Sequence, residues 1–352
     1  MRLIKNFLIL LIIFSNTGFG KDFKELFVIY EPLNDPASIE KSINSSFNTM
    51  VFRLSGSASP SNIWKIINAG NARKDFISSY SIKNFDEKSF LQVNFDKDAL
   101  IKVFKELKIP VVGNSRPVVL ILMKVDSGSM DPYFITSYEI KNSIDELIQN
   151  AIFNFSNSRG IFIELPDIDL TDRFDLLKYE KLIDSKDFIS SKYLSDKVVT
   201  IDLTKVGLNN WSVTGDVNNQ YSNDEFYEDF FEDFDNYIEL EIDMLLSKNA
   251  VDITKEELIK IHINNINTLL DYKESRRIIE NMVGTIQMKI ISFDTDEIGF
   301  EVRMLGGFKT LEKQITENSF FEIIQGSLND KYLRLEYKQW LNILFLFQIY
   351  FQ

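Results

Sequence analysis

An uninterrupted apolar run, Val118-Val119-Leu120-Ile121-Leu122-Met123, decides the expected fold. A strand that is apolar on both faces is typical of the centre of a parallel sheet, because helices cover both sides of such a sheet. Further apolar strands at 160–165 and 198–203 alternate with helical patterns at 143–156 and 174–194. This alternation predicts crossover connections and therefore a mostly parallel central α/β sheet.

The regions on either side of this sheet also alternate strands with helices. The earlier region predicts a βααββα unit in which Asp96 caps the last helix. The later region predicts a βαββαβ series, which is the ferredoxin-like plan. The expected fold class is multi-domain α+β or α/β. We expect a signal peptide at 1–20, an N-terminal α/β domain at 23–112, a central α/β domain at 116–220, an acidic amphipathic helix at 223–247, a ferredoxin-like domain at 252–338 and an apolar tail at 339–352.

Residues 1–20 have the composition of a secretory signal. Basic Arg2 and Lys5 precede an apolar run at 7–14, and small residues end the segment at Gly20. The run is shorter than the roughly 20 apolar residues that a membrane-spanning helix needs. We therefore expect cleavage after Gly20 and export to the periplasm.

Composition excludes several classes of protein. The chain has no Cys, which excludes disulfides, thiolate nucleophiles, Cys-ligated zinc and lipid attachment to a cysteine. An exported chain of this kind fits a Gram-negative periplasm. The formal net charge of −13 argues against nucleic-acid binding, because phosphate backbones repel a polyanion. We expect no cofactor.

Several short motifs occur in a characteristic order. They are Met50-Val51-Phe52-Arg53-Leu54-Ser55-Gly56, Val93-Asn94-Phe95-Asp96, Leu107-Lys108-Ile109-Pro110-Val111-Val112-Gly113, Asn114-Ser115-Arg116-Pro117, Gly207-Leu208-Asn209-Asn210-Trp211 and Leu305-Gly306-Gly307. Over roughly 25–338 the chain resembles a bacterial envelope family, the domain of unknown function numbered 2066. It departs from that family at Leu194-Ser195-Asp196-Lys197, where a "GAD"-like turn is usual, and in the tail. The resemblance implies an envelope protein, and it implies no catalytic residues.

His262 is the sole histidine of the chain. Strand alternation places it on the face opposite Ile261 and Ile263. One interpretation is a general base or metal ligand, and the other is a solvent-facing strand residue. We favour the second, because a single histidine cannot build a His-rich zinc site and leaves few options for a Ser-His-Asp triad.

An acidic loop follows the strand that ends before Pro166. It contains Asp167, Asp169 and Asp172, with Asp175 one helical turn later. Ligands of parallel sheets bind at the carboxyl ends of strands, so this loop is the weak candidate for a divalent-cation or catalytic site. It lacks the glycine of calcium loops, and the alternative is a solvated loop in which Thr171 or Asp172 caps the next helix.

The segment 224–235 combines acids with aromatic residues. The apolar stripe at helical spacing predicts either a packing helix with a charged outer face or a docking surface for a basic protein partner. Burial of Tyr227 and Phe231 would favour packing. The candidate partner-binding residues are Phe226, Tyr227, Phe230, Phe231 and Phe234.

Residues 340–352 are very apolar but too few to span a membrane as a helix. We expect a packed tail, with membrane contact as the alternative. The leading hypothesis is a non-catalytic exported envelope protein that binds or scaffolds an envelope protein partner. The alternative is a carboxylate-dependent hydrolase or cation-binding enzyme centred on 167–175.

Overall fold

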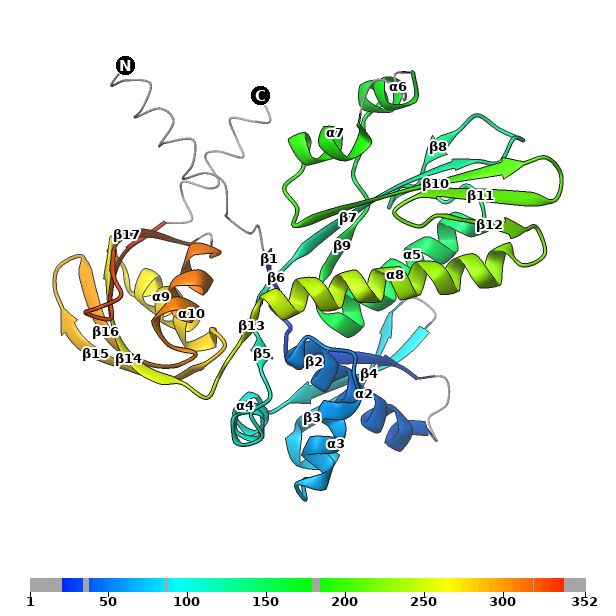
Figure 1. Ribbon diagram of the computed structural model, residues 1–352. Helices are drawn as coiled ribbons and strands as arrows, with labels where there is room; N and C mark the ends of the chain where they lie inside the picture. Colours follow the sequence, from blue (N-terminus) through cyan, green and yellow to red (C-terminus); the bar gives the residue numbers. More distant parts are fainter. Residues whose placement is uncertain (1–20, 34–37, 86–87, 179–183, 319, 339–352) are drawn as a thin grey trace, which may run out of the picture. The chain divides into compact units, whose positions relative to one another are not determined.

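The computed structural model describes residues 21–33, 38–85, 88–178, 184–318 and 320–338 (Figure 1). These residues form a mixed α/β protein with nine α-helices and several sheets. The expected signal peptide with its cleavage site at Gly20 and the expected tail lie outside the described residues. Two compact units are distinguished, of which unit 1 contains 117–152 and 162–237, and unit 2 contains 21–116, 153–161 and the described residues from 238 onward.

Unit 1 is built on a six-stranded sheet around β7. Strands β9 and β10 pair with β7 in parallel, as the apolar run predicted. β8, β11 and β12 are antiparallel to their neighbours. The bounds are β7 (Val118–Asp126), β8 (Tyr133–Phe134), β9 (Phe162–Glu164), β10 (Lys197–Val206), β11 (Asn210–Gly215) and β12 (Asn219–Ser222).

The expectation of a mostly parallel sheet was therefore wrong. Two strand pairs are parallel and three are antiparallel among the described strands. The physical reason is the length of the connections, because short loops join β10 to β11 and β11 to β12, and such loops can join only antiparallel strands.

Helices lie on both faces of this sheet (Figure 1). Val118, Leu120 and Leu122 of β7 pack in one cluster with Leu176 and Ile189 of α6 and α7. The predicted helix at 174–194 is two helices, and Asp184 caps the second of them by accepting the N–H groups of Lys186 and Asp187. The helices are α5 (Ser143–Arg159), α6 (Leu170–Lys178), α7 (Ser185–Lys192) and α8 (Phe226–Lys248), of which α5 and α8 are divided between the two units.

The first part of unit 2 has its elements in the predicted βααββα order. The strands form an antiparallel sheet in the order β2-β4-β3. Asp96 caps α4 as predicted, since its Oδ1 accepts the Ala99 N–H at 3.0 Å. The bounds are β2 (Val28–Pro32), α2 (Ile39–Ser55), α3 (Ser61–Asn68), β3 (Ile77–Phe85), β4 (Lys88–Phe95) and α4 (Lys97–Glu106).

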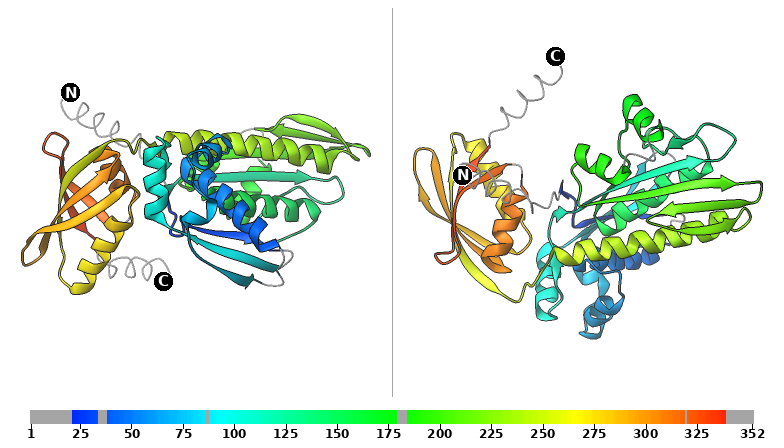
Figure 2. Two further views of the ribbon diagram at one scale, coloured as in Figure 1. Left: turned by 90° about the horizontal axis from the view of Figure 1, so that it is seen from below. Right: turned by 45° about the horizontal axis from the view of Figure 1, so that its top comes forward.

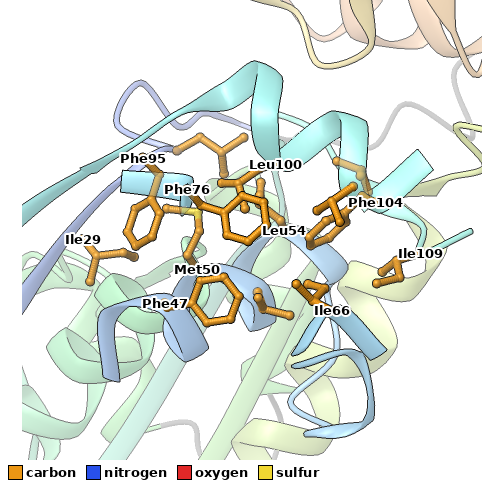
Figure 3. Packing of buried hydrophobic residues seen from close by; sticks show 14 of the residues in the cluster. Ile29, Phe47, Met50, Leu54, Ile66, Phe76, Phe95, Leu100, Phe104 and Ile109 are labelled. Carbon is orange, nitrogen blue, oxygen red and sulfur yellow. The ribbon is translucent and has the colours of Figure 1, made fainter. Parts of the chain in front are cut away.

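The core of this part is rich in aromatic side chains (Figure 3). The rings of Phe47 and Phe76 stack with centroids 5.6 Å apart. Ile253, Val283 and Leu305, from the last part of the chain, belong to the same buried cluster. Burial of apolar surface is the main stabilising contribution to folding, so this shared core explains why unit 2 joins segments far apart in sequence.

The last part of unit 2 is a five-stranded sheet in the order β15-β16-β14-β18-β17. Helices α9 and α10 cover one face of it (Figures 1 and 2). The elements are β14 (Glu256–Asn264), α9 (Leu269–Asn281), β15 (Thr285–Phe293), β16 (Glu297–Leu305), α10 (Gly307–Thr316), β17 (Phe321–Ser327) and β18 (Tyr332–Tyr337).

The predicted βαββαβ series lacked β17. This strand forms an antiparallel hairpin with β18, and β18 lies parallel to β14. The last strand of a simple βαββαβ sheet would run antiparallel to the first, so the added hairpin reverses the direction of the strand beside β14. β17 alternates poorly, because Gly326 and a register shift interrupt it.

Short elements complete unit 2. β1 (Lys21–Asp22) pairs with β6 (Ser115–Arg116), and β13 (Ala250–Val251) pairs with β5 (Val111–Val112). A 3-10 turn, η2 (Arg73–Phe76), precedes β3. Within the described ranges, none of the helices has both the length and the apolar character needed to cross a membrane.

Candidate functional site

The acidic loop after β9 is held by hydrogen bonds and an ion pair. Asp169 Oδ1 accepts the N–H of Asp172 at 2.8 Å, so Asp169 caps α6, and the expectation of Thr171 or Asp172 as the cap was wrong. Asp172 is buried and paired with Lys192, while Asp167 is exposed. In the part of the chain that the structure describes, no group of three or more His, Asp or Glu residues is placed to hold a metal ion.

His262 lies on the outer face of the last sheet, as strand alternation predicted. Its Nδ1 is 2.6 Å from Glu297 Oε1, and Arg334 Nη2 binds the other oxygen of the same carboxylate at 2.5 Å. The side chains of His262 and Glu297 are only 23% and 24% exposed. These three residues form a charged network that ties β14, β16 and β18 together.

This network makes the free energy of unfolding depend on pH. Hydrogen bonds from His262 and Arg334 hold the pKa of Glu297 below its usual value of 4.5. Because the folded-state pKa is the lower one, the stabilisation is complete above about pH 4.5 and is lost as the pH falls through the folded value. We expect Glu297→Gln to lower the free energy of unfolding by about 1 kcal/mol at pH 7 and by less at pH 3, which is below the usual pKa of a glutamate.

Urea unfolding of both chains at the two pH values measures this difference. An equal loss at pH 7 and pH 3 would show that the variant acts through packing and not through the carboxylate charge.

The aromatic stripe of α8 is part of the core of unit 1. Phe226, Phe230 and Phe234 are each 0% exposed. The ring of Phe226 stacks on Trp211 with centroids 4.5 Å apart and on Phe230 at 5.2 Å. Side chains that are completely buried in this way cannot form a docking surface, so these three residues are corrected from candidate partner contacts to core residues.

The two remaining aromatic residues of α8 differ from the stripe. Tyr227 is 47% exposed, and its hydroxyl lies 3.1 Å from Ser143 Oγ. Phe231 is half-buried and meets Phe230 edge to face. Neither is fully buried, so Tyr227 and Phe231 are the only two of the five predicted residues that present surface.

Three arginine side chains are buried together in unit 2, and sequence reasoning did not find them. Arg53, Arg116 and Arg159 are 1%, 0% and 3% exposed. We call these three residues the arginine centre. Arg116 donates from Nη1 to the Arg53 carbonyl at 3.0 Å and from Nη2 to the Val112 carbonyl at 3.1 Å. Arg53 donates to the carbonyls of Glu25, Leu26, Val28 and Asn157.

Within the arginine centre, Arg159 is the residue that forms ion pairs with acidic side chains. Its Nη2 pairs with Asp243 and donates to the Gly56 carbonyl at 3.2 Å. Its Nη1 lies 3.6 Å from Glu239, which is within ion-pair distance but longer than a hydrogen bond. The other two arginines bind mainly backbone oxygens.

The ends of two helices explain why cations gather here. The last carbonyls of a helix lack intrahelical partners and carry partial negative charge. α2 ends at Ser55, and the carbonyls of Arg53 and Gly56 at this end accept hydrogen bonds from Arg116 and Arg159. Asn157, in the last turn of α5, offers its carbonyl to Arg53. The arginine centre therefore satisfies the carboxyl ends of α2 and α5.

Burial makes these charges costly. It lowers the pKa of Arg53 to about 9, with the negative charge of Glu25 acting in the opposite direction. The pKa of Arg116 is lowered first by burial and then by the positive charges of Arg53 and Arg159. The Nε atoms of all three have no hydrogen-bond partner among the described residues. The contacts with backbone oxygens and with the acids of α8 offset this cost, together with the charge of Glu25 and the Phe23 ring, whose centroid lies 5.3 Å from Arg53 Cζ.

The arginine centre unites two motifs that the sequence showed separately. Arg53 belongs to the motif at 50–56 and Arg116 to the motif at 114–117. Gly160 completes the packing, because it has a φ of 58° and a Cβ there would lie 2.9 Å from Arg53 Cδ. The sequence did contain a signal for this centre, because Arg53 is enclosed by apolar residues in Val51-Phe52-Arg53-Leu54. Such a setting indicates burial, and an arginine is almost never fully buried unless it is paired.

A large groove also lies in unit 2. It has a volume of about 910 Å³ and runs along α9, so we call it the α9 groove. Its charged lining residues are Lys24, Lys97, Arg277, Asp271, Glu274 and Glu317. Its apolar and aromatic lining includes Phe27, Leu270, Ile278, Met282, Phe320 and Tyr337.

The walls of the α9 groove are partly desolvated. Burial lowers the pKa of Lys97, against the opposing effect of Asp98 and Glu280, and Lys97 Nζ donates to the Glu280 carbonyl at 3.0 Å. Burial also raises the pKa of Tyr337, and the carboxylates of Asp271 and Glu274 raise it further.

Polar groups of the groove suit hydrogen bonding to a peptide. Asn114 lines the groove, and its Oδ1 is buried without a hydrogen-bond partner in the described structure. The lining offers donors, acceptors and apolar surface together, which are the features of a binding site for a small molecule or a peptide. His262 is not among its residues.

Comparison with known proteins gives no relative for this chain. It matches no protein-family model, no curated protein and no solved structure. The fold and site described above are therefore the basis on which a function is inferred.

Proposed function

We propose that this chain is an exported, non-catalytic protein of the bacterial envelope that binds a protein partner through the α9 groove. The groove carries this proposal, because its volume of about 910 Å³ and its mixed lining suit an extended peptide better than a small polar substrate. Its three cations and three carboxylates could pair with either sign of charge on a partner. The resemblance to the envelope family supports the same location.

Export rests on the signal-like residues 1–20. An exported chain of this size without disulfides fits a Gram-negative periplasm better than the exterior of the cell. In the proposed protein, the βααββα part and the part with the five-stranded sheet act as one binding body. The shared core of Ile253, Val283 and Leu305 with the first part supports this arrangement.

The alternative of a hydrolase centred on 167–175 receives no support from the geometry. Asp169 is engaged as a helix cap and Asp172 in an ion pair with Lys192. A carboxylate that already has a lysine partner is poorly suited to act as a metal ligand or as a general base.

A photo-crosslinker placed in the groove tests the proposed partner. We would put p-benzoylphenylalanine in place of Leu270, which is 67% exposed and lines the groove, and in place of Leu208, which is 89% exposed on unit 1. After irradiation of intact cells, we expect one defined polypeptide linked at position 270 and not at position 208. The same adducts at both positions, or none at 270, would contradict partner binding by the groove.

Fractionation tests the proposed compartment separately. We expect the periplasmic fraction to contain a chain that begins at Lys21. A chain that keeps residues 1–20 and stays in the cytosol would refute export while leaving the groove hypothesis intact.

A further inference from the structure

We propose that the partner segment bound by the α9 groove is an extended peptide that carries an acidic side chain and, about four residues away, a basic side chain. This inference rests on the proposed function, because it names the chemistry of the segment that the same groove binds. The observation that carries it is the distribution of charge along α9. The lining is positive near one end of this helix and negative near the other.

The carboxyl end of α9 has a lysine beside it. Lys97 lines the groove, and its Nζ donates at 3.0 Å to the carbonyl of Glu280, the residue before the last of α9. An ammonium has three N–H donors, and this bond uses one of them. Burial lowers the pKa of Lys97, so a carboxylate that contacts the ammonium would stabilise its charged form.

A second lysine, Lys24, lies near the same end of the helix. The residue before it, Phe23, donates its N–H to the Asn114 carbonyl at 2.8 Å. A Cβ on Gly113, next to Asn114, would lie 3.8 Å from the Cβ of Val283, which comes two residues after the end of α9. Lys24 is exposed, lines the groove and has no hydrogen-bond or ion-pair partner among the described residues. It is therefore available to a ligand.

The amino end of α9 is negative. Asp271 and Glu274 belong to the first two turns of the helix, and both line the groove. Burial raises the pKa of Tyr337 and these two carboxylates raise it further, so both lie near its hydroxyl. Arg277 compensates only part of this charge, because its Nε and Nη2 bind Glu274 Oε2 at 3.0 and 2.8 Å.

Glu317 is the remaining charged residue of the lining. Its side chain is 11% exposed and lies 4.0 Å from Lys313 Nζ, so its charge is already paired within the unit. Glu317 therefore leaves the charge of Lys24 and Lys97 largely uncompensated.

The length of α9 sets the spacing of charges in the occupant. Asp271 and Glu280 are nine residues apart in the helix, which corresponds to about 14 Å. An extended peptide rises about 3.3 Å per residue, so about four residues cover this length. An acidic side chain for the two lysines and a basic side chain for the carboxylates complement both ends. A segment with charges of one sign would place like charges together at one end, which costs free energy.

Apolar side chains complete the lining. Phe27, Ile278 and Phe320 are half-buried, and Leu270 is 67% exposed. Burial of apolar surface is favourable in proportion to the area covered. We therefore expect apolar residues between the acidic and the basic residue of the segment.

Selection from a phage library of random peptides, long enough to span α9, tests this inference on the purified full chain. We expect the enriched peptides to combine Asp or Glu with Lys or Arg at a spacing of about three to five residues. Enrichment of apolar peptides without this charge pair, or no enrichment, would overturn the inference.

Two lysines provide matched variants. Lys24 and Lys102 are both exposed in unit 2, but only Lys24 lines the groove. For the most enriched peptide, we expect Lys24→Glu to raise the Kd about tenfold, because an attraction becomes a repulsion, and Lys102→Glu to leave it within about twofold. Equal effects of the two variants would overturn the inference.

A change in the peptide identifies the group that Lys24 contacts. When the acidic residue of the peptide is replaced by glutamine, we expect the effect of Lys24→Glu to fall to within about threefold, because contacting residues do not act additively. An effect that persists in full with the glutamine peptide would contradict the contact.

Partner crosslinking in cells is a separate measurement. A partner adduct at position 270, together with enriched peptides that lack the charge pair, would reject this inference and keep the proposed function. The absence of an adduct at position 270 would reject the proposed function, whichever peptides bind the purified chain.

Discussion

Replacing Arg116 with methionine is expected to lower the free energy of unfolding of unit 2 by about 3 kcal/mol. Arg116 is completely buried and donates to the carbonyls of Arg53 and Val112. Methionine fills similar volume but removes the hydrogen bond that Arg116 donates to each oxygen, at about 1–3 kcal/mol each. Loss of the repulsion from Arg53 and Arg159 acts in the opposite direction, which keeps the expected net loss in the lower half of the roughly 2–6 kcal/mol that the two bonds together imply.

Arg303→Met is the matched control for this prediction. Arg303 is in the same unit, but it is 46% exposed and its Nε lies 3.4 Å from Glu256. Exposed ion pairs contribute about 0–1 kcal/mol, so this variant should be nearly as stable as the unchanged chain.

Hydrogen exchange in urea measures the two units separately, because peptides from α2 report on unit 2 and peptides from β7 report on unit 1. An Arg116→Met chain as stable as the unchanged protein would mean that repulsion among the arginines outweighs their bonds to the helix ends.

Substitution of Gly215 by alanine is expected to destabilise unit 1 by about 4 kcal/mol. Gly215 has a φ of 112°, and a Cβ there would lie 2.2 Å from the Thr200 carbonyl oxygen. This oxygen accepts the Asp216 N–H at 2.8 Å, and the Asp216 carboxylate accepts the Thr200 N–H at 2.7 Å. A methyl group would therefore push the end of β11 away from β10 at the point where Asp216 bonds to both the carbonyl and the N–H of Thr200.

Gly207, at the other end of the same hairpin, provides the control. Its φ is 68°, and a Cβ at this position would meet nothing within 4 Å. We therefore expect Gly207→Ala to lower the free energy of unfolding only by the roughly 1–2 kcal/mol that a left-handed backbone conformation costs a residue with a Cβ.

The comparison is made from the hydrogen exchange of peptides from β10 in both variants. Equal losses for Gly207→Ala and Gly215→Ala would show that backbone conformation, and not the contact with Thr200, accounts for the effect.

Local patterns were sufficient for most of the helices and strands. The apolar run at 118–123 is the centre of β7, and the apolar stripe of the acidic segment is the buried side of α8. The cap at Asp96 was also predicted, because a cap depends on residues only three positions apart. β12 and β17 were not predicted, since short strands at the ends of a sheet are stabilised by the neighbour with which they pair.

The candidate site was much less accessible from the sequence. The aspartates after β9 formed a plausible ligand pattern, yet the structure uses Asp169 as a cap and pairs Asp172 with Lys192. The role of a carboxylate depends on the groups that it contacts. The sequence did not reveal this contact, because Lys192 lies twenty positions from Asp172 in the chain. His262 was placed on the correct face by alternation, but its partners Glu297 and Arg334 come from two other strands.

The order of amino acids is enough to set the periodicity of each element, because hydrogen bonds and side-chain spacing within an element involve near neighbours. It also sets the absence of cysteine chemistry and the negative charge of the chain. The folded chain alone brings Arg53, Arg116 and Arg159 together and forms the α9 groove from segments that begin at Lys24 and end at Tyr337. These features form where the ends of helices and strands that are far apart in the sequence lie close together in the fold. Burial of apolar residues in the shared core determines which of these ends lie together.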